Sequence, residues 1–230
     1  MTRFKFMLFI AVLVGFAALA YAGFEEGSDA YVRGDYAVAY SEFKPLAEQG
    51  DARAQINLGQ MYFEGQGVPQ DYVESVKWTR KAADKGNHFA QSNLGMMYLE
   101  GKGVPQDYAE ALKWYRKAAE QGLADAQYYM GVMYYQGQGV QQDHAEAANW
   151  YRKAAEHGDA RAKVDLGWMY IKGIGVPQSY VKAHMWLNLA AAQGNSEARK
   201  LRDLLAEKMT PAQIAEAQRL AREWKPKGEN

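Results

Sequence analysis

The chain reads AQINLGQMYFEGQGVPQD at residues 54–71, and the pattern returns 36 residues later as AQSNLGMMYLEGKGVPQD at residues 90–107. Two more copies follow without a gap, which gives four aligned repeats: residues 51–86, 87–122, 123–158 and 159–194. A fixed period of this size is typical of helical solenoids, in which each unit buries its apolar face only against its neighbours. The sequence therefore predicts an all-α repeat protein with an extended surface, which favours binding over catalysis.

Each repeat is expected to form two antiparallel helices, the first over residues 52–64 in the first copy. Its apolar side chains recur at i, i+4, i+7 and i+8, the spacing of one helical stripe: Ala54, Leu58, Met61 and Tyr62. The N-cap position holds Asp51, Asn87 and Asp159, whereas Leu123 breaks the pattern. A glycine such as Gly59 inside this helix costs about 1 kcal/mol relative to alanine, so we expect close approach of the paired helix.

A Gly-x-Gly-Val-Pro-Gln link separates the two helices, with Gln141 in place of proline in the third copy. Glycine permits positive φ and proline stops the helix, so this segment predicts a turn. The second helix begins at predicted capping boxes: Asp71/Glu74, Asp107/Glu110 and Asp143/Glu146. It carries a recurring tryptophan followed by two alanines, and we expect these four indoles to be buried framework: Trp78, Trp114, Trp150 and Trp186.

The two ends depart from the repeat, as the caps of a solenoid do. Residues 23–50 are predicted to form a degenerate N-terminal capping unit, with a short helix and then a helix that ends at Gln49. Residues 195–230 are predicted to form two C-terminal capping helices, over 196–208 and 211–224, and a frayed tail.

The first 22 residues have the pattern of a signal peptide. Arg3 and Lys5 precede an apolar run over residues 6–19, and Ala20-Tyr21-Ala22 fits the small-x-small cleavage pattern. We expect cleavage before Gly23 and export to the periplasm or the extracellular space. The alternative is an uncleaved anchor over residues 6–22, a length at the lower limit for crossing a bilayer.

Composition excludes several classes of protein. The chain has no cysteine, which excludes disulfide bonds and thiolate metal sites. Loss of Arg3 and Lys5 leaves 25 basic against 27 acidic side chains, a net charge of about −2. Such a balance gives no electrostatic footprint for nucleic acid or for an anionic membrane, so we expect neither as a partner. We also expect no stable membrane insertion once the signal peptide is cleaved.

The repeated motif A-x-x-x-LG-x-MY-x-x-G-x-GVPQDY-x-x-A-x-x-WY-x-KAA-x-x-G resembles the Sel1-like repeat (SLR), a relative of the tetratricopeptide repeat. The resemblance covers residues 51–194 strongly and the flanks weakly. It implies a right-handed superhelical solenoid of antiparallel helix pairs that scaffolds protein–protein contacts. Bacterial members are often exported and tied to envelope or host-facing processes. A cysteine-rich branch is associated with β-lactam binding, and that association transfers poorly to a chain without cysteine.

The same resemblance places repeat positions 3, 6, 10, 13 and 14 of each first helix on the concave surface. This face is rich in apolar and aromatic side chains, and its candidate partner-binding residues are Arg53, Phe63, Phe89, Met96, Tyr128, Tyr135, Arg161, Trp168 and Lys172. The wider face adds Ile56, Gln60, Glu64, Ser92, Leu99, Glu100, Asp125, Val132, Gln136, Val164 and Ile171. We expect a groove for an extended or helical peptide, anchored near Tyr128, Tyr135 and Trp168. The alternative is that some of these residues, notably Leu99, Val132 and Ile171, pack one repeat on the next.

Catalytic signals are weak. The Gly-x-Gly link follows a helix and not a strand, unlike a phosphate-binding loop. Ser41-x-x-Lys44 and Ser179-x-x-Lys182 match the Ser-x-x-Lys of penicillin-recognising enzymes, but the companion motifs are absent and Ser179 is a predicted N-cap. The four histidines do not cluster: His88, His144, His157 and His184. We predict no enzyme, no cofactor and no metal.

These observations predict an exported adaptor that binds a partner protein or peptide of the envelope or secreted space. The alternative function is a binder, or a weak hydrolase, of cell-wall or small ligands such as muropeptides or β-lactams. A third hypothesis is a peptidoglycan or polysaccharide contact through exposed aromatic side chains.

Overall fold

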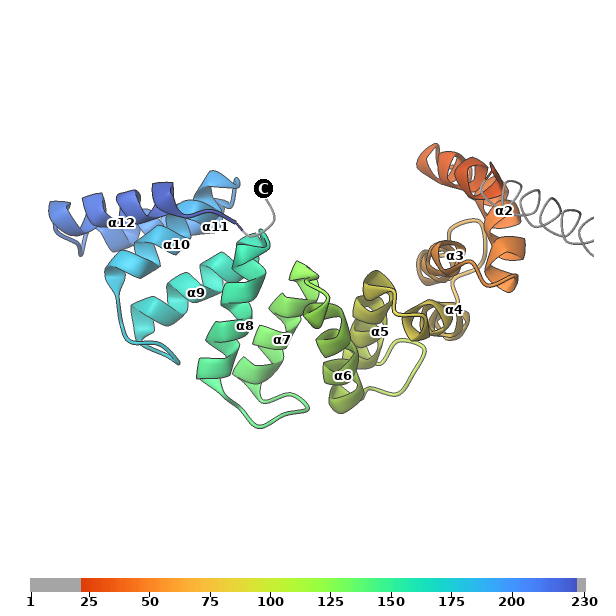
Figure 1. Cartoon of the computed structure of the whole chain (residues 1–230), viewed down its shortest axis with the longest axis horizontal. Coiled ribbons are helices and arrows are strands. Elements are labelled where there is room, and N and C mark those ends of the chain that lie inside the picture. Colours follow the sequence, from red (N-terminus) through yellow and green to blue (C-terminus); the bar gives the residue numbers. More distant parts are fainter. Residues whose placement is uncertain (1–21, 227–230) are drawn as a thin grey trace, which may run out of the picture. The chain divides into compact units, whose positions relative to one another are not determined.

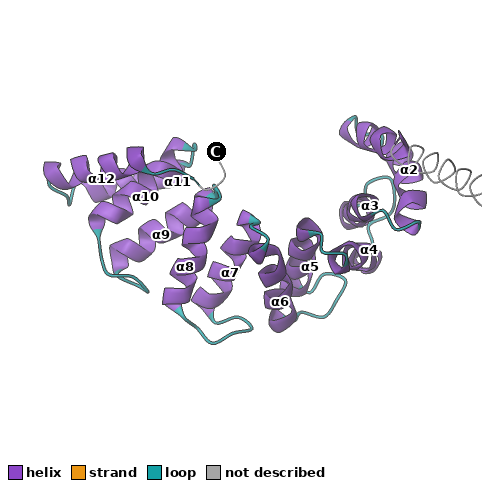
Figure 2. Ribbon diagram, in the orientation of Figure 1, coloured by secondary structure: helices purple, strands orange, loops and turns teal. Residues whose placement is uncertain are grey.

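The computed structural model describes residues 22–226, and this part of the chain consists of helices joined by loops, with no strand (Figure 2). The predicted signal peptide and its anchor alternative lie outside the described residues except for residue 22, as do residues 227–230 of the predicted tail. Among the described residues, no helix has both the length and the apolar character needed to cross a bilayer.

Residues 22–32 form the first described helix. It is followed by α2 (Tyr36–Glu48), α3 (Ala52–Glu64), α4 (Tyr72–Asp84), α5 (His88–Glu100), α6 (Tyr108–Glu120), α7 (Ala124–Gln136), α8 (His144–Glu156), α9 (Ala160–Lys172), α10 (Tyr180–Ala192), α11 (Ser196–Ala206) and α12 (Pro211–Glu223). Helix α3 has the predicted bounds, and every helix from α3 to α10 is 13 residues long. Helices α2, α11 and α12 end one or two residues earlier than predicted.

The chain divides into two compact units after Gln106, inside the second repeat. In the first unit α2 packs on α3, α3 on α4, and α4 on α5. In the second unit each helix from α6 to α10 packs on the next, and α10 also contacts α11 and α12 (Figure 1). Helices thus contact their neighbours along the chain, the packing expected of a repeat solenoid.

The predicted framework is buried. Leu58 and Met61 of the apolar stripe are fully buried, and so are their counterparts Leu166 and Met169 to within a few per cent. The four repeated tryptophans are only 5–7% exposed, which confirms that they belong to the framework.

The mid-helix glycines face the paired helix closely, as predicted. A Cβ built on Gly131 would lie 2.5 Å from the Tyr151 ring, and one on Gly167 would lie 2.8 Å from Cγ of Leu187. No side chain fits at either position without movement of the neighbour, so the glycines let α7 approach α8 and α9 approach α10.

The links take the expected turn. Gly137 and Gly139 have φ of 72° and 67°, and this third link keeps its conformation although Gln141 replaces proline. A contact that the sequence analysis did not anticipate holds each link: Nε2 of Gln142 donates to the Tyr135 carbonyl at 2.8 Å. The equivalent glutamines make the same bond at 2.8 Å in the other three repeats. The link is therefore tied to the last turn of the first helix.

Helix caps follow the prediction in part. Asp51, Asn87 and Asp159 accept from the backbone of their first turns, and α7 begins at Leu123 with no side-chain cap. The predicted capping boxes of α4, α6 and α8 are wrong in their second half. Their aspartates cap the helices, but each glutamate accepts a hydrogen bond from the side chain three residues later. Nζ of Lys77, for example, donates to Glu74 at 2.9 Å. The charged or amide partner on the helix surface takes the place of the N-cap backbone N–H.

Candidate functional site

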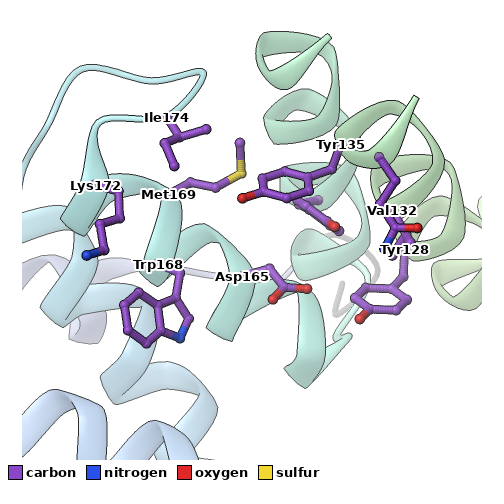
Figure 3. Close-up of a pocket in the computed structure, with 10 residues that line it drawn as sticks. Tyr128, Val132, Tyr135, Asp165, Trp168, Met169, Lys172 and Ile174 are labelled. Atoms are coloured by element: carbon purple, nitrogen blue, oxygen red, sulfur yellow. The ribbon is translucent and has the colours of Figure 1, made fainter. Parts of the chain in front are cut away.

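A cavity of about 490 Å³ opens between α7 and α9 in the second unit (Figure 3). Helix α8 contributes one ring to its wall, and the link after α9 contributes one aliphatic side chain. The lining consists of Tyr128, Val132, Tyr135, Gln136, Tyr151, Asp165, Trp168, Met169, Lys172 and Ile174.

A second hollow of about 210 Å³ adjoins the first and shares Tyr128, Asp165 and Trp168 with it. Its remaining lining is mostly polar: Arg161, Val164, Asn195 and Glu197. One apolar, aromatic hollow and one polar hollow thus meet at three shared side chains.

Helical spacing places these side chains. Tyr128, Val132 and Tyr135 are at i, i+4 and i+7 of α7, which puts them on one face of the helix. Asp165, Trp168 and Lys172 are at i, i+3 and i+7 of α9 and share a face in the same way. Because α7 and α9 are the first helices of consecutive repeats, the two faces come from equivalent parts of the repeat.

The aromatic wall is held by ring contacts. The Tyr128 and Tyr151 rings lie 5.7 Å apart between centroids, and Tyr135 contacts the His144 ring at 4.8 Å. Tyr151 is buried, whereas 39% of Trp168 is exposed. The cavity therefore combines tyrosines fixed by neighbouring rings with an indole that is open to solvent.

The guanidinium of Arg161 interacts with groups of its own protein. It forms ion pairs with Asp159 at 2.6 Å and Asp125 at 2.7 Å, and it lies 4.1 Å from the centroid of the Tyr128 ring. Two carboxylates thus balance its charge, and its plane covers part of the Tyr128 ring.

Asp165 lies in the middle of the lining, between Trp168 and Tyr128 (Figure 3). Burial raises the pKa of this carboxyl to about 6, and the charges of Asp159 and Glu197 act in the same direction. A hydrogen bond from Tyr128 and the charge of Arg161 lower the pKa and only partly oppose that rise. Among the described residues, no lysine, arginine or histidine forms an ion pair with Asp165.

The two tyrosines near Asp165 stay protonated. Burial, followed by the charge of Asp165, raises the pKa of Tyr128 to about 12 and shifts the pKa of Tyr151 further in the same direction. Both phenols therefore keep their protons across the physiological range, whereas the Asp165 carboxyl, with a pKa of about 6, changes its charge close to neutrality.

The structure brings five of the nine predicted partner-binding residues together. Tyr128, Tyr135, Trp168 and Lys172 line the larger cavity, and Arg161 lines the adjoining hollow. Nζ of Lys172 lies 5.8 Å from the centroid of the Trp168 ring.

The other four predicted residues belong to the first unit and line neither hollow. Arg53 pairs with its own N-cap and lies 4.0 Å from the Phe24 ring. Phe63 packs against Tyr72, with centroids 5.1 Å apart. Phe89 is 55% exposed beside the His88 ring, and Met96 is half-buried.

Two members of the wider predicted face have little exposed area. Ser92 and Val164 are buried, and Val164 belongs to the core that joins α8, α9 and α10. Val164 nevertheless lines the polar hollow, whereas Ser92 lines neither hollow. Val132 and Ile171, which were open to either interpretation, pack half-buried against the same core.

Sequence patterns did not predict four residues of the larger cavity, Tyr151, Asp165, Met169 and Ile174, or two of the polar hollow, Asn195 and Glu197. Asp165 could have been found, because repeat position 7 shares a helix face with positions 3, 10 and 14. That position holds Asn57, Asn93, Tyr129 and Asp165 in the four copies. Its variation is the signal that marks a surface position and not framework.

Within residues 22–226, no group of three or more His, Cys, Asp or Glu side chains is placed to hold a metal ion. The lining offers one carboxylate, one amine and several rings, which suits the recognition of a side chain or a small polar molecule.

Comparisons with known proteins agree with the repeat. The Sel1 repeat family model matches residues 52–87, 88–123, 124–159 and 160–195. A Sel1 repeat protein from Oxalobacter formigenes is 33% identical, with a TM-score of 0.72, and the match covers 84% of this chain and 83% of that protein. No match was found among curated proteins.

A protective antigen present in uropathogenic Escherichia coli strains, which displays an SLR fold, is 39% identical with a TM-score of 0.79. The match covers 89% of this chain but only 46% of the antigen, so the chain spans less than half of that relative. An immunity protein from Pseudomonas aeruginosa shares the fold at 22% identity and a TM-score of 0.53, covering 88% of this chain and 78% of the immunity protein.

Proposed function

Because this chain belongs to the Sel1 repeat family, we propose that it is an exported adaptor that binds a partner protein of the envelope or secreted space through the cavity between α7 and α9. Proteins built from Sel1 repeats generally mediate protein–protein interactions, and the scaffold is generally non-catalytic. The observation that carries the proposal is the lining, in which an exposed Trp168 indole stands beside tyrosines held by ring contacts.

The chemistry of the two hollows supports a peptide as the occupant. Tryptophan, tyrosine and arginine dominate the binding energy of protein interfaces, and Trp168, Tyr128, Tyr135 and Arg161 all lie here. The larger hollow suits one long side chain, and the polar hollow beside it offers Asn195 and Glu197 to the amide groups of a peptide backbone.

Site-specific photo-crosslinking tests the adaptor role in the producing cells. We would place p-benzoylphenylalanine at position 168 and, as a matched control, at Val73, which is 65% exposed on α4 and lines neither hollow. The proposal expects a discrete crosslinked protein from position 168 and none from position 73. Equal crosslinking at both positions, or no crosslinked protein from position 168, would contradict it.

A loss-of-binding variant gives the complementary test. The Trp168→Ala/Tyr135→Ala double variant should fold and lose the partner that the unchanged protein retains in a pull-down, because it removes two rings of the lining. A folded double variant that keeps every partner would show that the cavity is not the docking site.

The export part of the proposal depends on the first 22 residues, with their basic start and their Ala20-Tyr21-Ala22 end. Intact-mass measurement of the protein from cell fractions should give a chain that begins at Gly23 in the periplasm or the medium. A full-length chain in the membrane fraction would support the anchor alternative.

A second candidate, a binder of muropeptides, β-lactams or glycans, is favoured by the cavity volume, which falls in the range of small-ligand sites. A thermal shift with muropeptides or β-lactams, or sedimentation with cell-wall sacculi, would support it if the effect disappears in Trp168→Ala.

A further inference from the structure

We propose that the cavity between α7 and α9 recognises a basic side chain of its partner, a lysine or an arginine, with the cation at Asp165 and the aliphatic stem on Trp168. This inference rests on the proposed function and adds to it the chemistry of the partner. It commits the occupant to a peptide segment that carries a positive charge.

The first argument is the charge of the site. Asp165 is a largely buried carboxyl with no ion-pair partner among the described residues, in the middle of a cavity wide enough for a long side chain. The nearby cation Arg161 is already shared between Asp125 and Asp159. A buried carboxylate that lacks a cation is costly, and an incoming ammonium or guanidinium would remove that cost.

The adjoining hollow adds to the negative character of the site. Glu197 lines it from the start of α11, and its charge already acts on Asp165. Lys172 is the one cation in the lining of the larger cavity, and it comes from the last residue of α9. An acidic side chain that entered the cavity would be repelled by the carboxylate of Asp165, and the charge of Glu197 would add to that repulsion. An acidic occupant is therefore unfavourable.

The second argument is the aromatic wall. The face of an aromatic ring attracts a cation, most strongly for tryptophan, and the attraction grows where water is excluded. The chain uses this contact elsewhere: lysine Nζ lies 4.0 Å from the Trp78 centroid, 4.0 Å from that of Trp114 and 3.8 Å from that of Trp150. At Trp168 the lysine is 5.8 Å away and the indole stays 39% exposed. Trp168 is thus open to a cation of the partner.

The two arguments meet at one place, because Asp165 and Trp168 are three residues apart on the same face of α9. A lysine or arginine has an apolar stem and a charged head, so it can lie along the indole and still reach the carboxylate. A norleucine side chain could make the first contact but not the second.

Protonation of Asp165 supplies a consistent signature. The groups that face this carboxyl are Tyr128 on α7, Tyr151 on α8, Asp159 and Arg161 at the start of α9, and Glu197 on α11. With a pKa near 6, the carboxyl is ionised at neutral pH and becomes neutral as the pH falls below 6. Binding of a basic side chain should therefore weaken in that range.

Calorimetric titration of the purified protein with three blocked pentapeptides tests the inference. The peptides have the sequence Ala-Leu-Xaa-Leu-Ala, in which the central residue is lysine, norleucine or glutamate, so they differ only at one side chain. Asp165→Asn is the test variant, and Asn already occupies this repeat position at Asn57 and Asn93. Asp84→Asn, an exposed site at the end of α4, is the matched control for the same change of charge.

We expect the lysine peptide to bind at least about tenfold more tightly than the norleucine peptide at neutral pH, with the glutamate peptide weakest. Asp165→Asn should reduce this preference to about twofold or less, as should a pH of about 5, and Asp84→Asn should leave it unchanged. The inference is overturned if the norleucine or glutamate peptide binds as tightly, if the preference survives Asp165→Asn, or if none of the three binds at about 1 mM.

The outcomes separate this inference from the adaptor role. A partner crosslinked at position 168 together with no preference for lysine would support the docking site and contradict its selectivity for a basic side chain. Binding of the lysine peptide with no crosslinked partner in cells would support the selectivity for a basic side chain and contradict the adaptor role.

Discussion

Helices α3 and α9 begin and end at the same repeat positions and differ in what their surfaces offer. Asp51 and Asp159 cap them, and Gly65 and Gly173 end them in the left-handed conformation with φ of 71° and 69°. At position 10, however, α3 has Gln60, whose amide bonds Glu64 on its own helix at 3.0 Å. The same position of α9 has Trp168, which is 39% exposed and follows the largely buried carboxyl of Asp165 by three residues.

This difference separates two kinds of residue in one repeat. The caps, the leucine–methionine stripe, the glycines and the tryptophan of the second helix set the geometry, and they are nearly the same in each copy. A binding site then requires only a few changes on the outer face of a helix whose position is already fixed. Stability and recognition should consequently respond to different substitutions.

The largest expected effect compares two tryptophans. Trp150→Ala should destabilise the protein by about 3–5 kcal/mol, because the indole is only 7% exposed and its removal leaves a cavity. Trp168→Ala should cost about 1 kcal/mol or less, since that side chain is partly in solvent. Urea unfolding followed by circular dichroism measures both. Equal losses would end the distinction between framework and site.

The links test the framework further. Gly139 has φ of 67°, and a Cβ there would overlap the carbonyl of Tyr108 on the neighbouring repeat. Gly139→Ala should therefore cost about 2–4 kcal/mol, from the left-handed backbone and the overlap together. Gly158→Ala is the control, because φ is 94° but nothing lies within 4 Å of the new Cβ, and it should cost about 1–2 kcal/mol. A larger loss at Gly158 in the same unfolding assay would mean that contact in the link is unimportant.

Sequence periodicity predicted the framework closely, because that part of the fold depends on contacts repeated in every copy. The bounds of α3, the burial of the tryptophans and the positive φ of the link glycines all follow from residues that recur every 36 positions. The prediction of reciprocal capping boxes was wrong, because Glu74 can bond either the N-cap backbone N–H or Lys77, and sequence spacing does not say which bond is stronger. Full reciprocity occurs instead at Thr210 and Gln213.

The site was harder to predict than the fold. Periodicity identified the variable face, and the aromatic side chains on it singled out Tyr128, Tyr135 and Trp168, but the candidate list also took in residues from the first two copies. Phe63 and Phe89 occupy that face in the first unit and contact rings of their own surroundings instead. The lining also takes residues from the framework and the link, which no single-helix pattern includes.

A third prediction concerns Asp165→Asn, which gives α9 the residue that α3 has at the same repeat position, Asn57. Burial holds the pKa of Asp165 at about 6, above the value near 4 expected in the unfolded chain. The folded protein therefore retains a proton that the unfolded chain has lost between about pH 4 and pH 6. The stabilisation that this proton gives is complete below about pH 4 and is lost as the pH rises through 6.

Asp165→Asn should therefore stabilise the protein at pH 7 by about 1–2 kcal/mol, less than the full shift would give because the carboxyl is partly exposed. The gain should shrink as the pH falls toward 4. Unfolding curves at a series of pH values measure it, with Asp84→Asn as the control. A loss of stability at pH 7 would show that the ionised carboxylate stabilises the folded protein and does not destabilise it.

The smallest expected effect concerns α7, which shares the cavity with α9 but begins without a side-chain cap. Leu123→Asp should stabilise the protein by about 0.5–1 kcal/mol, because an aspartate there can accept from the first-turn N–H groups as Asp159 does in α9. Asn87→Ala is the reverse experiment and should cost about 1 kcal/mol at the same position of the second repeat. Thermal unfolding resolves both changes. If Leu123→Asp destabilises instead, the packing of the half-buried leucine stabilises α7 more than a side-chain cap would, and the third repeat has exchanged a polar contact for an apolar one.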